Sequence, residues 1–539
     1  MRQLFLGGRV FTADPGRPWA QAVVVDGERI AFVGNEIEAI RFAGPTAGRF
    51  HLGGGVLLPG FVDGHAHLIM TGDALLKAQL RSAKDLADIQ GRVAAWAAEH
   101  PDAPRVLGLG WVFSAVPDGR PTKEMLDAVV SDRPVFLDAS DLHSSWLNSR
   151  ALAELGITDD TPDPIGGRIV RDPVTGEATG HLLENATVTM VWPLLDRVDQ
   201  ATRDQRLAAA AVAYNECGVT AAVDMALDKA MFTTMRRADE AGTLSIRVAG
   251  HWLIHRTGDA KAELAQVAAA AAAMASYRSD RLRIAGIKII ADGTIDGCTA
   301  ALLNPYTNGV NAAPIWDLES LTAVVTAADA SGLQVAIHAI GDLTVRNAID
   351  ALEHAIAVNG SSDHRHRIEH LEYVDAADIS RLHALGITAS MQPVHVDPVQ
   401  LPNWIAMLGP ERADRGFAWR EFLDAGTTLA FGTDTPTAPH LPLHNMFIAA
   451  TRKSPSDLSL SPHRPDNALP LTEAIEHGTR DSAWASFDEH RIGMIRTGLF
   501  ADLAAVDIDV FAAEPEALLS ARVMLTMLAG HTVYRSSDD

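Results

Sequence analysis

Short apolar runs alternate with longer Ala-rich segments along most of the chain, from about residue 60 to residue 485. The apolar runs have the length and β-branched content of buried strands, whereas segments such as 264–277 and 343–357 have a helical pattern. Besides the run that leads into Gly60, the expected strands are residues 218–224, 246–250, 284–290, 333–338, 367–370, 386–391 and 428–432. Eight strands alternating with helices predict an α/β fold, a (β/α)8 or TIM barrel.

Both chain ends have a different pattern, in which short strands are separated by turns. Residues 22–25 and 29–34 flank Asp26-Gly27, a pair typical of tight hairpin turns. Strand-like segments resume at residue 493 and continue to residue 534. Several short strands this close together indicate a small β-sandwich. The expected domains are sandwich parts at 1–58 and 490–539, and a barrel at 59–489.

One region is too long for a minimal barrel. Roughly 150 residues separate the first expected strand from the strand near residue 220, far more than a usual βα loop contains. This region has its own expected strand, residues 134–138, and clusters of turn residues at 117–121 and 158–173. We predict that residues 72–205 form an insertion subdomain over the barrel mouth.

Composition narrows the class of protein. A chain of 539 residues that is 47% hydrophobic can bury a large core, and 21% charged residues without low-complexity tracts argue against disorder. The formal net charge of -23 argues against nucleic acid and anionic membranes as partners. Two cysteines give no disulfide framework, and we find neither a secretory leader nor a long apolar span. We expect a soluble, cytoplasmic protein with a small-molecule substrate, and a homodimer stays open.

Two histidines, His65 and His67, follow the first expected strand. Side chains two residues apart on a strand point to the same face, so both imidazoles should converge on one point. Two converging imidazoles suit a divalent metal such as Zn²⁺. A chance pair of surface histidines is the alternative.

Further polar residues lie at or near the carboxyl ends of later strands, where the catalytic groups of such barrels are found. They are Lys288 in the fourth strand, His338 at the end of the fifth, His370 at the end of the sixth and Asp434 at the end of the eighth. Each also has a structural explanation. The histidines can be hydrogen-bonded core residues, and Asp434 can cap a helix before Thr435-Pro436. Lys288 lies among isoleucines, where an unpaired ammonium is costly, so a salt bridge with Asp292 or Asp434 is one solution.

Taken together, these stretches resemble a known family. Residues 60–68, Gly-Phe-Val-Asp-Gly-His-Ala-His-Leu, are similar to the signature that opens the barrel of the metal-dependent amidohydrolase superfamily, and the later polar residues match its binuclear pattern. Residues 143–152, 166–172 and 179–184 are similar to its YtcJ-like branch, which includes N-substituted formamide deformylase. The resemblance covers nearly the whole chain. It implies that both chain ends pair into one sandwich beside the barrel.

The resemblance also implies a site and a reaction. Two divalent ions, expected to be Zn²⁺, would be held by His65, His67, Lys288, His338, His370 and Asp434. Lys288 would carry a carbamate formed with CO₂ and bridge the ions. A metal-bridging hydroxide would attack the substrate, and Asp434 would pass the proton to the leaving nitrogen.

The leading function is therefore hydrolysis of a carbon–nitrogen bond in a linear amide, such as an N-substituted formamide or another N-acyl compound. Hydrolysis of cyclic amides, carbamates or esters is an alternative, because such a site activates water without dictating the acyl group. A non-catalytic regulatory or binding protein is a third interpretation, and the intact ligand set argues against it.

Substrate contacts are predicted from weaker signals. Candidates are Trp111, Asp141, His143 and Asp296. Trp111 can instead pack in the insertion core. Residues 294–299, which include Asp296 and Cys298, depart from the run with an arginine that related chains carry, and Cys298 can be a small packed residue. His143 or His395 can support an oxyanion, although we favour an exposed or capping role for His395.

Overall fold

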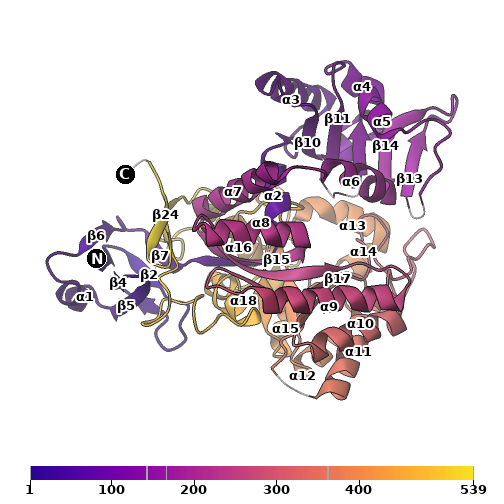
Figure 1. Ribbon diagram of the computed structural model, residues 1–539. Helices are drawn as coiled ribbons and strands as arrows, with labels where there is room; N and C mark the ends of the chain where they lie inside the picture. Colours follow the sequence, from indigo (N-terminus) through magenta and orange to yellow (C-terminus); the bar gives the residue numbers. More distant parts are fainter. Residues whose placement is uncertain (1, 141, 143, 165–166, 361–362, 538–539) are drawn as a thin grey trace. The chain divides into compact units, whose positions relative to one another are not determined.

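The barrel is built from eight parallel strands. The computed structural model describes residues 2–140, 142, 144–164, 167–360 and 363–537. In spatial order, the strands of its largest sheet are β8 (Phe61–Ala66), β15 (Val219–Leu227), β16 (Arg247–Ile254), β17 (Leu282–Ile290), β18 (Gln334–Ala339), β19 (Arg367–His370), β20 (Thr388–Met391) and β21 (Leu429–Phe431). Ala66 pairs in parallel with Thr435, and this bridge joins the last strand to the first. The predicted (β/α)8 barrel is confirmed (Figure 1).

Helices follow the strands and cover the outside of the barrel (Figure 1). They are α8 (Lys229–Glu240), α9 (Ala260–Ser276), α10 (Leu318–Ala330), α11 (Asp342–Asn359), α12 (Ala376–Ala384), α13 (Leu401–Leu408), α14 (Pro410–Ala413), α15 (Trp419–Asp424), α16 (Pro442–Thr451), α17 (Leu471–His477) and α18 (Arg480–Ala485). Asp259 and Asp317 begin α9 and α10 by accepting a backbone N–H in the first turn, which satisfies an otherwise orphan donor. In α11, buried residues Val345, Ala348 and Leu352 form the stripe that faces the barrel.

The two chain ends form two further sheets that share one core. One sheet has the order β5 (Arg29–Gly34), β4 (Ala22–Asp26), β1 (Arg2–Leu6), β6 (Gly48–His51). The other has the order β24 (His531–Arg535), β23 (Val523–Leu528), β22 (Leu503–Val506), β7 (Val56–Pro59), β2 (Arg9–Phe11), β3 (Trp19–Ala20). The antiparallel pair β7 and β22 joins the amino-terminal part to the carboxyl-terminal part. Buried side chains from both sheets, such as Phe5 and Leu503, pack in this core, and α1 (Glu36–Ala43) packs on the first sheet.

Residues 69–210, with Pro436–Ala438, form a separate compact unit. Its mixed sheet has the order β13 (Gly167–Arg171), β14 (Ala178–Glu184), β12 (Ser144–Leu147), β11 (Val135–Ala139), β10 (Val106–Trp111), β9 (Ala78–Gln79). The helices are α3 (Leu86–Glu99), α4 (Lys123–Asp127), α5 (Ser149–Leu155) and α6 (Trp192–Leu195). Two further helices, α2 (Leu68–Leu75) and α7 (Gln200–Glu216), cross the boundaries of this unit. The strand expected at 134–138 corresponds to β11. The other strands of this sheet were not expected.

Among the described residues, no helix combines the length and apolar character needed to cross a lipid bilayer.

Candidate metal centre

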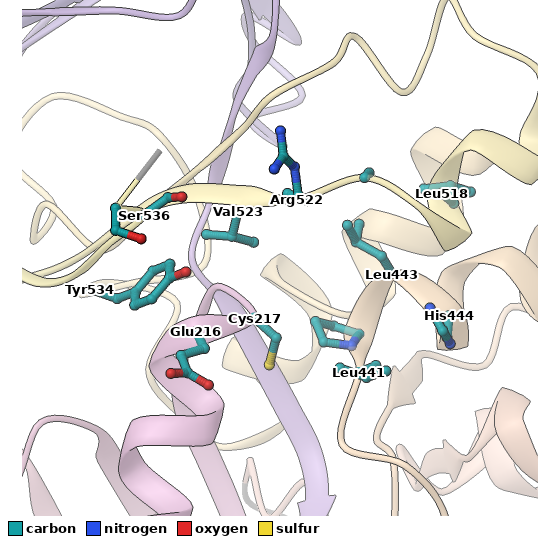
Figure 2. A pocket seen from close by; sticks show the side chains of 13 residues that line it. Glu216, Cys217, Leu441, Leu443, His444, Leu518, Arg522, Val523, Tyr534 and Ser536 are labelled. Atoms are coloured by element: carbon teal, nitrogen blue, oxygen red, sulfur yellow. The ribbon is translucent and has the colours of Figure 1, made fainter. Parts of the chain in front are cut away.

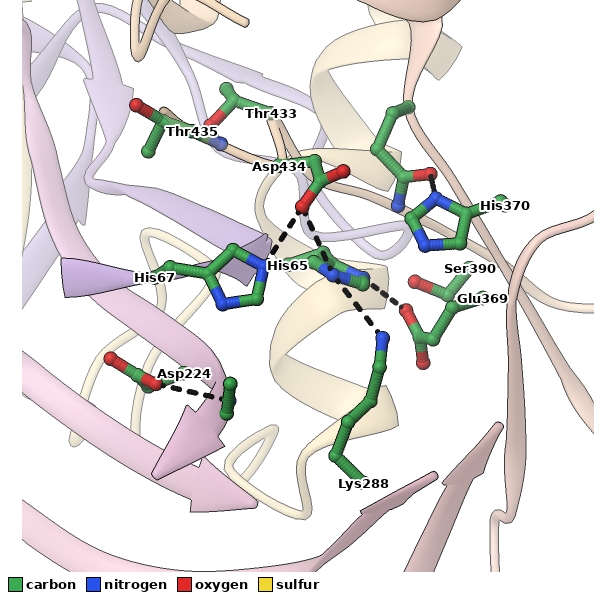
Figure 3. A network of polar contacts seen from close by, with 12 residues as sticks. His65, His67, Asp224, Lys288, Glu369, His370, Ser390, Thr433, Asp434 and Thr435 are labelled. Atoms are coloured by element: carbon green, nitrogen blue, oxygen red, sulfur yellow. Dashed lines mark hydrogen bonds and ion pairs between the residues drawn. The ribbon is translucent and has the colours of Figure 1, made fainter. Parts of the chain in front are cut away.

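His65 and His67 lie at the carboxyl end of the first barrel strand. His65 is in β8 and His67 follows it, so their rings are near neighbours, with centroids 5.5 Å apart. Both Nε2 atoms approach one carboxylate oxygen, Asp434 Oδ1, at 3.3 Å and 3.0 Å (Figure 3). Asp224 in β15 accepts the N–H of Leu68 at 2.9 Å and fixes the chain just after His67. The convergence expected from the sequence spacing is therefore present.

The segment that contains Asp434 is held against β8 by the buried carboxylate of Asp63, which accepts several hydrogen bonds. The Asp63 carboxylate accepts the backbone N–H and hydroxyl of Thr433 at 2.8 Å and 2.6 Å, and the hydroxyl of Tyr214 at 3.0 Å. The N–H of Asp434 donates to the carbonyl of His65 at 2.7 Å. Asp434 has φ +56°, a conformation that non-glycine residues seldom adopt outside strained or functional positions. Burial opposes ionisation of Asp434, but the neighbouring histidines hold its pKa well below its usual range.

Asp434 does not cap a helix. Within the described residues, the next helix after it is α16, which begins at Pro442. The N-cap explanation considered from the sequence is therefore wrong, and the conformation of Asp434 is fixed by its contacts with β8.

Lys288 projects from β17 toward the same point. It is 2% exposed, and its Nζ lies 3.4 Å from Nε2 of His65. Burial lowers the pKa of Lys288 to about 8, although the charges of Glu369 and Asp434 act in the opposite direction. Asp292, one of the salt-bridge partners considered from the sequence, instead accepts three backbone N–H groups. The neutral amine of Lys288 is therefore more accessible near neutral pH than that of an ordinary exposed lysine.

Glu369 orients His65 and was not identified from the sequence. Its Oε2 lies 2.6 Å from Nδ1 of His65, and Arg367 donates to both Glu369 oxygens at 2.5 Å and 3.2 Å. Burial opposes ionisation of Glu369, but Arg367 and His65 hold its pKa well below its usual range. Because a carboxylate only accepts, Nδ1 of His65 carries the proton that is donated to Glu369. The lone pair of the neutral ring is then on Nε2, which lies on the side of Asp434 and Lys288.

His338 and His370 complete the set of histidines. Their ring centroids are 4.5 Å apart, and the ring of His370 lies 4.9 Å from that of His65. Nε2 of His338 faces the carbonyl oxygen of Gly293 at 3.2 Å, so Nε2 carries the proton and Nδ1 the lone pair. Nδ1 of His370 lies 2.8 Å from Oε1 of Gln392, which leaves its Nε2 as the lone-pair nitrogen. Burial lowers the pKa of His338 to about 3 and that of His370 well below its usual range, so both rings are neutral.

These residues fit a divalent metal. Ligand atoms of His65, His370 and Asp434 all lie within 4.8 Å of one another. Two ligands on one tetrahedral ion, each about 2.1 Å from it, lie about 3.4 Å apart. The spacings of 3.3 Å and 3.0 Å from Asp434 to His65 and His67 are close to that value. Neutral imidazoles, an ionised carboxylate and a buried amine are donors suited to Zn²⁺ and similar ions.

His395 also belongs to this site, contrary to our expectation. It lies in the short 3₁₀ helix η4 (Pro393–Val396), with Nδ1 3.0 Å from Oε1 of Glu372 and Nε2 3.5 Å from Oδ2 of Asp434. Its ring stacks on His370 at 5.8 Å with an interplanar angle of 12°. Burial lowers the pKa of His395, but the bond to Glu372 outweighs it and the pKa is raised. The exposed or capping role favoured from the sequence is wrong, because Glu372 and Asp434 were not known to lie beside this residue.

Of the predicted substrate contacts, Trp111 lies in a hydrophobic core. It has no exposed surface, it packs on Trp146 and Phe113, and its indole N–H donates to the carbonyl of Leu137 at 3.0 Å. Packing in the insertion core, the alternative considered from the sequence, accounts for these contacts. Asp141 and His143 lie outside the described residues.

Asp296 lies near the polar end of the barrel. Its carboxylate accepts from the amide of Asn403 at 2.6 Å, and its charge raises the pKa of both Glu372 and His395. Cys298 is partly buried, and its Sγ contacts Sδ of Met407 at 3.0 Å, consistent with a packed residue.

A cavity of about 380 Å³ lies elsewhere, between the sandwich and the start of β15 (Figure 2). Its walls include Cys217, Leu443, Leu518, Val523 and Tyr534. Burial raises the pKa of the Cys217 thiol far above its usual range, so this thiol is a poor nucleophile. This cavity therefore offers no activated nucleophile at Cys217, and the histidine cluster lies outside it.

Comparisons with known proteins agree with this geometry. Residues 50–534 match the model of a family described as the amidohydrolase family. The chain is 30% identical to putative amidohydrolase YtcJ of Bacillus subtilis over the full length of both chains. It is 27% identical to N-substituted formamide deformylase of Arthrobacter pascens, covering 98% of each chain.

A solved structure, described as an uncharacterized metal-dependent hydrolase from Pyrococcus horikoshii, superposes with a TM-score of 0.78 at 23% identity. The match covers 96% of this chain and 99% of that one, and at this identity it supports the fold. With the family match over nearly all of its length, this chain belongs to the amidohydrolase family.

Proposed function

We propose that the protein is a metal-dependent hydrolase that cleaves the carbon–nitrogen bond of a linear N-substituted formamide or another small N-acyl compound. The observation that carries the proposal is a convergence at the carboxyl end of the barrel: the Asp434 carboxylate approaches both His65 and His67, and Lys288 approaches His65. The four side chains are wholly or largely buried and come from three separate parts of the chain, so their convergence is a product of the fold.

The proposed cofactors are two divalent ions, with Zn²⁺ as the expected metal. His65, His67, His338, His370 and Asp434 would hold them together with Lys288. When bound, such ions polarise a carbonyl group and lower the pKa of water. The chain supplies the orientation: Glu369 fixes the ring of His65, and Gly293 and Gln392 fix those of His338 and His370.

Lys288 is proposed to carry a carbamate. Its neutral amine nitrogen forms a bond to the carbon of CO₂ and loses a proton to solvent, which leaves an anionic carboxylate on Nζ. Burial, which lowers the pKa of Lys288 to about 8, supplies the neutral amine that this step needs. The long side chain then places an oxygen ligand where a shorter acidic residue on β17 would not reach.

Asp434 is the proposed general base and acid. Its ionised carboxylate lies within hydrogen-bonding distance of His67 and is anchored by the N–H donated to His65. In hydrolysis it accepts a proton from the attacking water and delivers it to the leaving nitrogen, so that an amine departs and a carboxylic acid remains.

Support for the acyl class comes from the relatives, one of which is an N-substituted formamide deformylase. Cyclic amides, carbamates and esters need the same activation of water, so a substrate panel decides among them. We expect the zinc-loaded enzyme to hydrolyse N-substituted formamides fastest in a panel of formamides, anilides, carbamates and lactones. Faster turnover of lactones or carbamates would mean that the substrate belongs to one of those classes and not to the linear N-acyl compounds.

Metal analysis tests the rest of the proposal. Protein purified without chelators is expected to contain about two divalent ions per chain. Activity should disappear on removal of metal and return when Zn²⁺ is restored. Full activity in a preparation firmly shown to hold no metal would overturn the proposal.

A further inference from the structure

Gln392 follows β20 and stands at the polar end of the barrel, where no ligand was expected from the seventh strand. It is 2% exposed. Its Oε1 lies 2.8 Å from Nδ1 of His370 and accepts the proton of that ring. Its Nε2 is buried and has no hydrogen-bond partner among the described residues.

A buried amide donor without a partner is rare in native proteins and points to something that binds there. The carboxamide atoms share one carbon, so the unused N–H groups lie beside the ring of His370. Three residues later, the His395 ring reaches within 3.5 Å of Asp434 Oδ2. Two residues after β20 therefore reach the site: His395 approaches Asp434, and Gln392 contacts His370 and has unused N–H donors.

The backbone opposite Gln392 is also unusual. His370 and Leu371 have φ values of +76° and +50°, and consecutive non-glycine residues in this region store strain. Such strain is commonly found at ligand sites, in agreement with a binding role for this corner of the barrel.

We propose that Gln392 is a substrate-binding residue whose carboxamide N–H groups donate to the acyl oxygen of the substrate, while its Oε1 keeps His370 in its ligating tautomer. This inference rests on the proposed function and adds a donor that the family assignment does not supply. Negative charge grows on that oxygen during attack on a carbonyl, so a fixed donor stabilises the transition state more than the ground state.

Two variants separate the two halves of the side chain. Gln392→Glu keeps an oxygen for the Nδ1–H of His370 but replaces the N–H donors. We expect wild-type metal content and a loss of about 10²–10³-fold in kcat, with a smaller change in KM. Gln392→Leu removes both halves, so metal affinity should also fall by about 10–100-fold.

The chain offers a matched control in Gln334. This glutamine is 3% exposed and its Oε1 pairs with Nε2 of His251 at 3.0 Å, but its amide donates to the carbonyls of Arg365 and Ala485. Its donors are therefore already used. Gln334→Glu should lower the melting temperature and leave kcat and metal content of the folded enzyme unchanged.

Methylphosphonate, a tetrahedral oxyanion, provides a readout that does not need turnover. Calorimetry with zinc-loaded protein should show at least about tenfold weaker binding to both Gln392 variants than to wild type and Gln334→Glu. Binding and kcat like wild type in Gln392→Glu would overturn the inference, and so would a metal loss equal to that of Gln392→Leu. If wild type hydrolyses nothing in the panel but shows the methylphosphonate contrast, the proposed function fails and the donor site stands.

Discussion

Two clusters of histidine and carboxylate lie at opposite ends of the barrel, and they differ in how their nitrogens are used. The carboxyl-end cluster contains His65, His370 and Asp434. The amino-end cluster contains Asp329, in α10, with His364 and His366 before β19. In each cluster the ligand-type atoms lie within 4.8 Å of one another, so proximity alone would label both as metal sites.

In the amino-end cluster the atoms that could bind a metal are already used in hydrogen bonds. Nδ1 of His366 accepts the N–H of Val335 at 3.0 Å, so its Nε2 carries the proton that is donated to Asp329 at 3.0 Å. His364 faces Asp329 with Nδ1 at 2.5 Å and a backbone carbonyl with Nε2 at 3.1 Å. The other Asp329 oxygen accepts from Asn359 at 2.7 Å. A metal would have to displace these bonds.

In the carboxyl-end cluster the hydrogen bonds of His65 and His370 are made on the side of each ring that faces away from the cluster. The far nitrogens of His65 and His370 are held by Glu369 and Gln392, which leaves the near nitrogens as lone pairs. A metal site is therefore distinguished by the group that accepts the proton of the far nitrogen of each histidine, because this group leaves the near nitrogen free to bind a metal. We therefore expect equivalent substitutions at the two ends of the barrel to have different effects.

The largest effect is expected from Lys288→Ala. Loss of the proposed bridging ligand should abolish turnover and weaken binding of at least one ion, and a short carboxylic acid added to the variant should restore part of the rate. Metal content and rate measure the loss, and intact mass under mild conditions with CO₂ measures the modification. An unmodified lysine in active, metal-loaded enzyme would rule out the carbamate.

Asp434→Asn should lower kcat by about 10²–10⁴-fold, because an amide does not shuttle the proton. The matched change at the amino end, Asp329→Asn, should leave kcat unchanged. Steady-state kinetics on equally metal-loaded enzymes makes the comparison. Near-normal turnover of Asp434→Asn with full metal content would assign Asp434 a structural role.

Glu369→Gln should weaken metal binding by about 10–100-fold, since the amide holds Nδ1–H of His65 less strongly and His65 becomes a poorer ligand. Competition with a chelator measures the affinity. His366→Gln at the amino end should leave the metal affinity unchanged. Equal affinities for wild type and Glu369→Gln would mean that Glu369 serves only to neutralise Arg367.

Much of this carboxyl-end site was open to prediction because strand ends in such a barrel converge. Apolar runs predicted the positions of the barrel strands, and the polar residue at or just beyond the end of a run predicted His338, His370 and Asp434. Gln392 and His395 carry the same signal, since they follow the strand expected at 386–391. Gln392 was missed because glutamine matches no familiar ligand pattern, and His395 was considered for oxyanion support but assigned an exposed or capping role because it lies farther from the strand end.

Other features depend on pairing that a linear pattern does not encode. Glu369 lies inside a strand, and its role exists only because β19 brings it beside His65. The pair β7 and β22 joins segments from opposite ends of the chain. In the sheet of residues 69–210, β12 buries Ser144 and Ser145, so its sequence lacks the apolar run of a typical strand.

The smallest effect expected is on stability, from Asp329→Asn. The asparagine amide would face N–H donors of His366 and Asn359, so buried donors would lose their acceptor at a cost of about 1–3 kcal/mol. Thermal or denaturant unfolding measures this cost. Metal content should not change, and a loss of metal would mean that the amino-end cluster binds an ion after all.

The pH dependence of that cost follows from the pKa of Asp329. Burial raises this pKa, but the hydrogen bonds from His366 and Asn359 outweigh burial and hold it below its ordinary value. A carboxylate whose pKa is lower in the folded state than in the unfolded state adds to the free energy of unfolding. This contribution is complete above the unfolded-state pKa of about 3.9 and is lost as the pH falls through the folded-state pKa. The stability difference between wild type and Asp329→Asn should therefore be constant from about pH 5 to 6 and shrink below about pH 4. A difference that grows on acidification would show that Asp329 is protonated in the native protein.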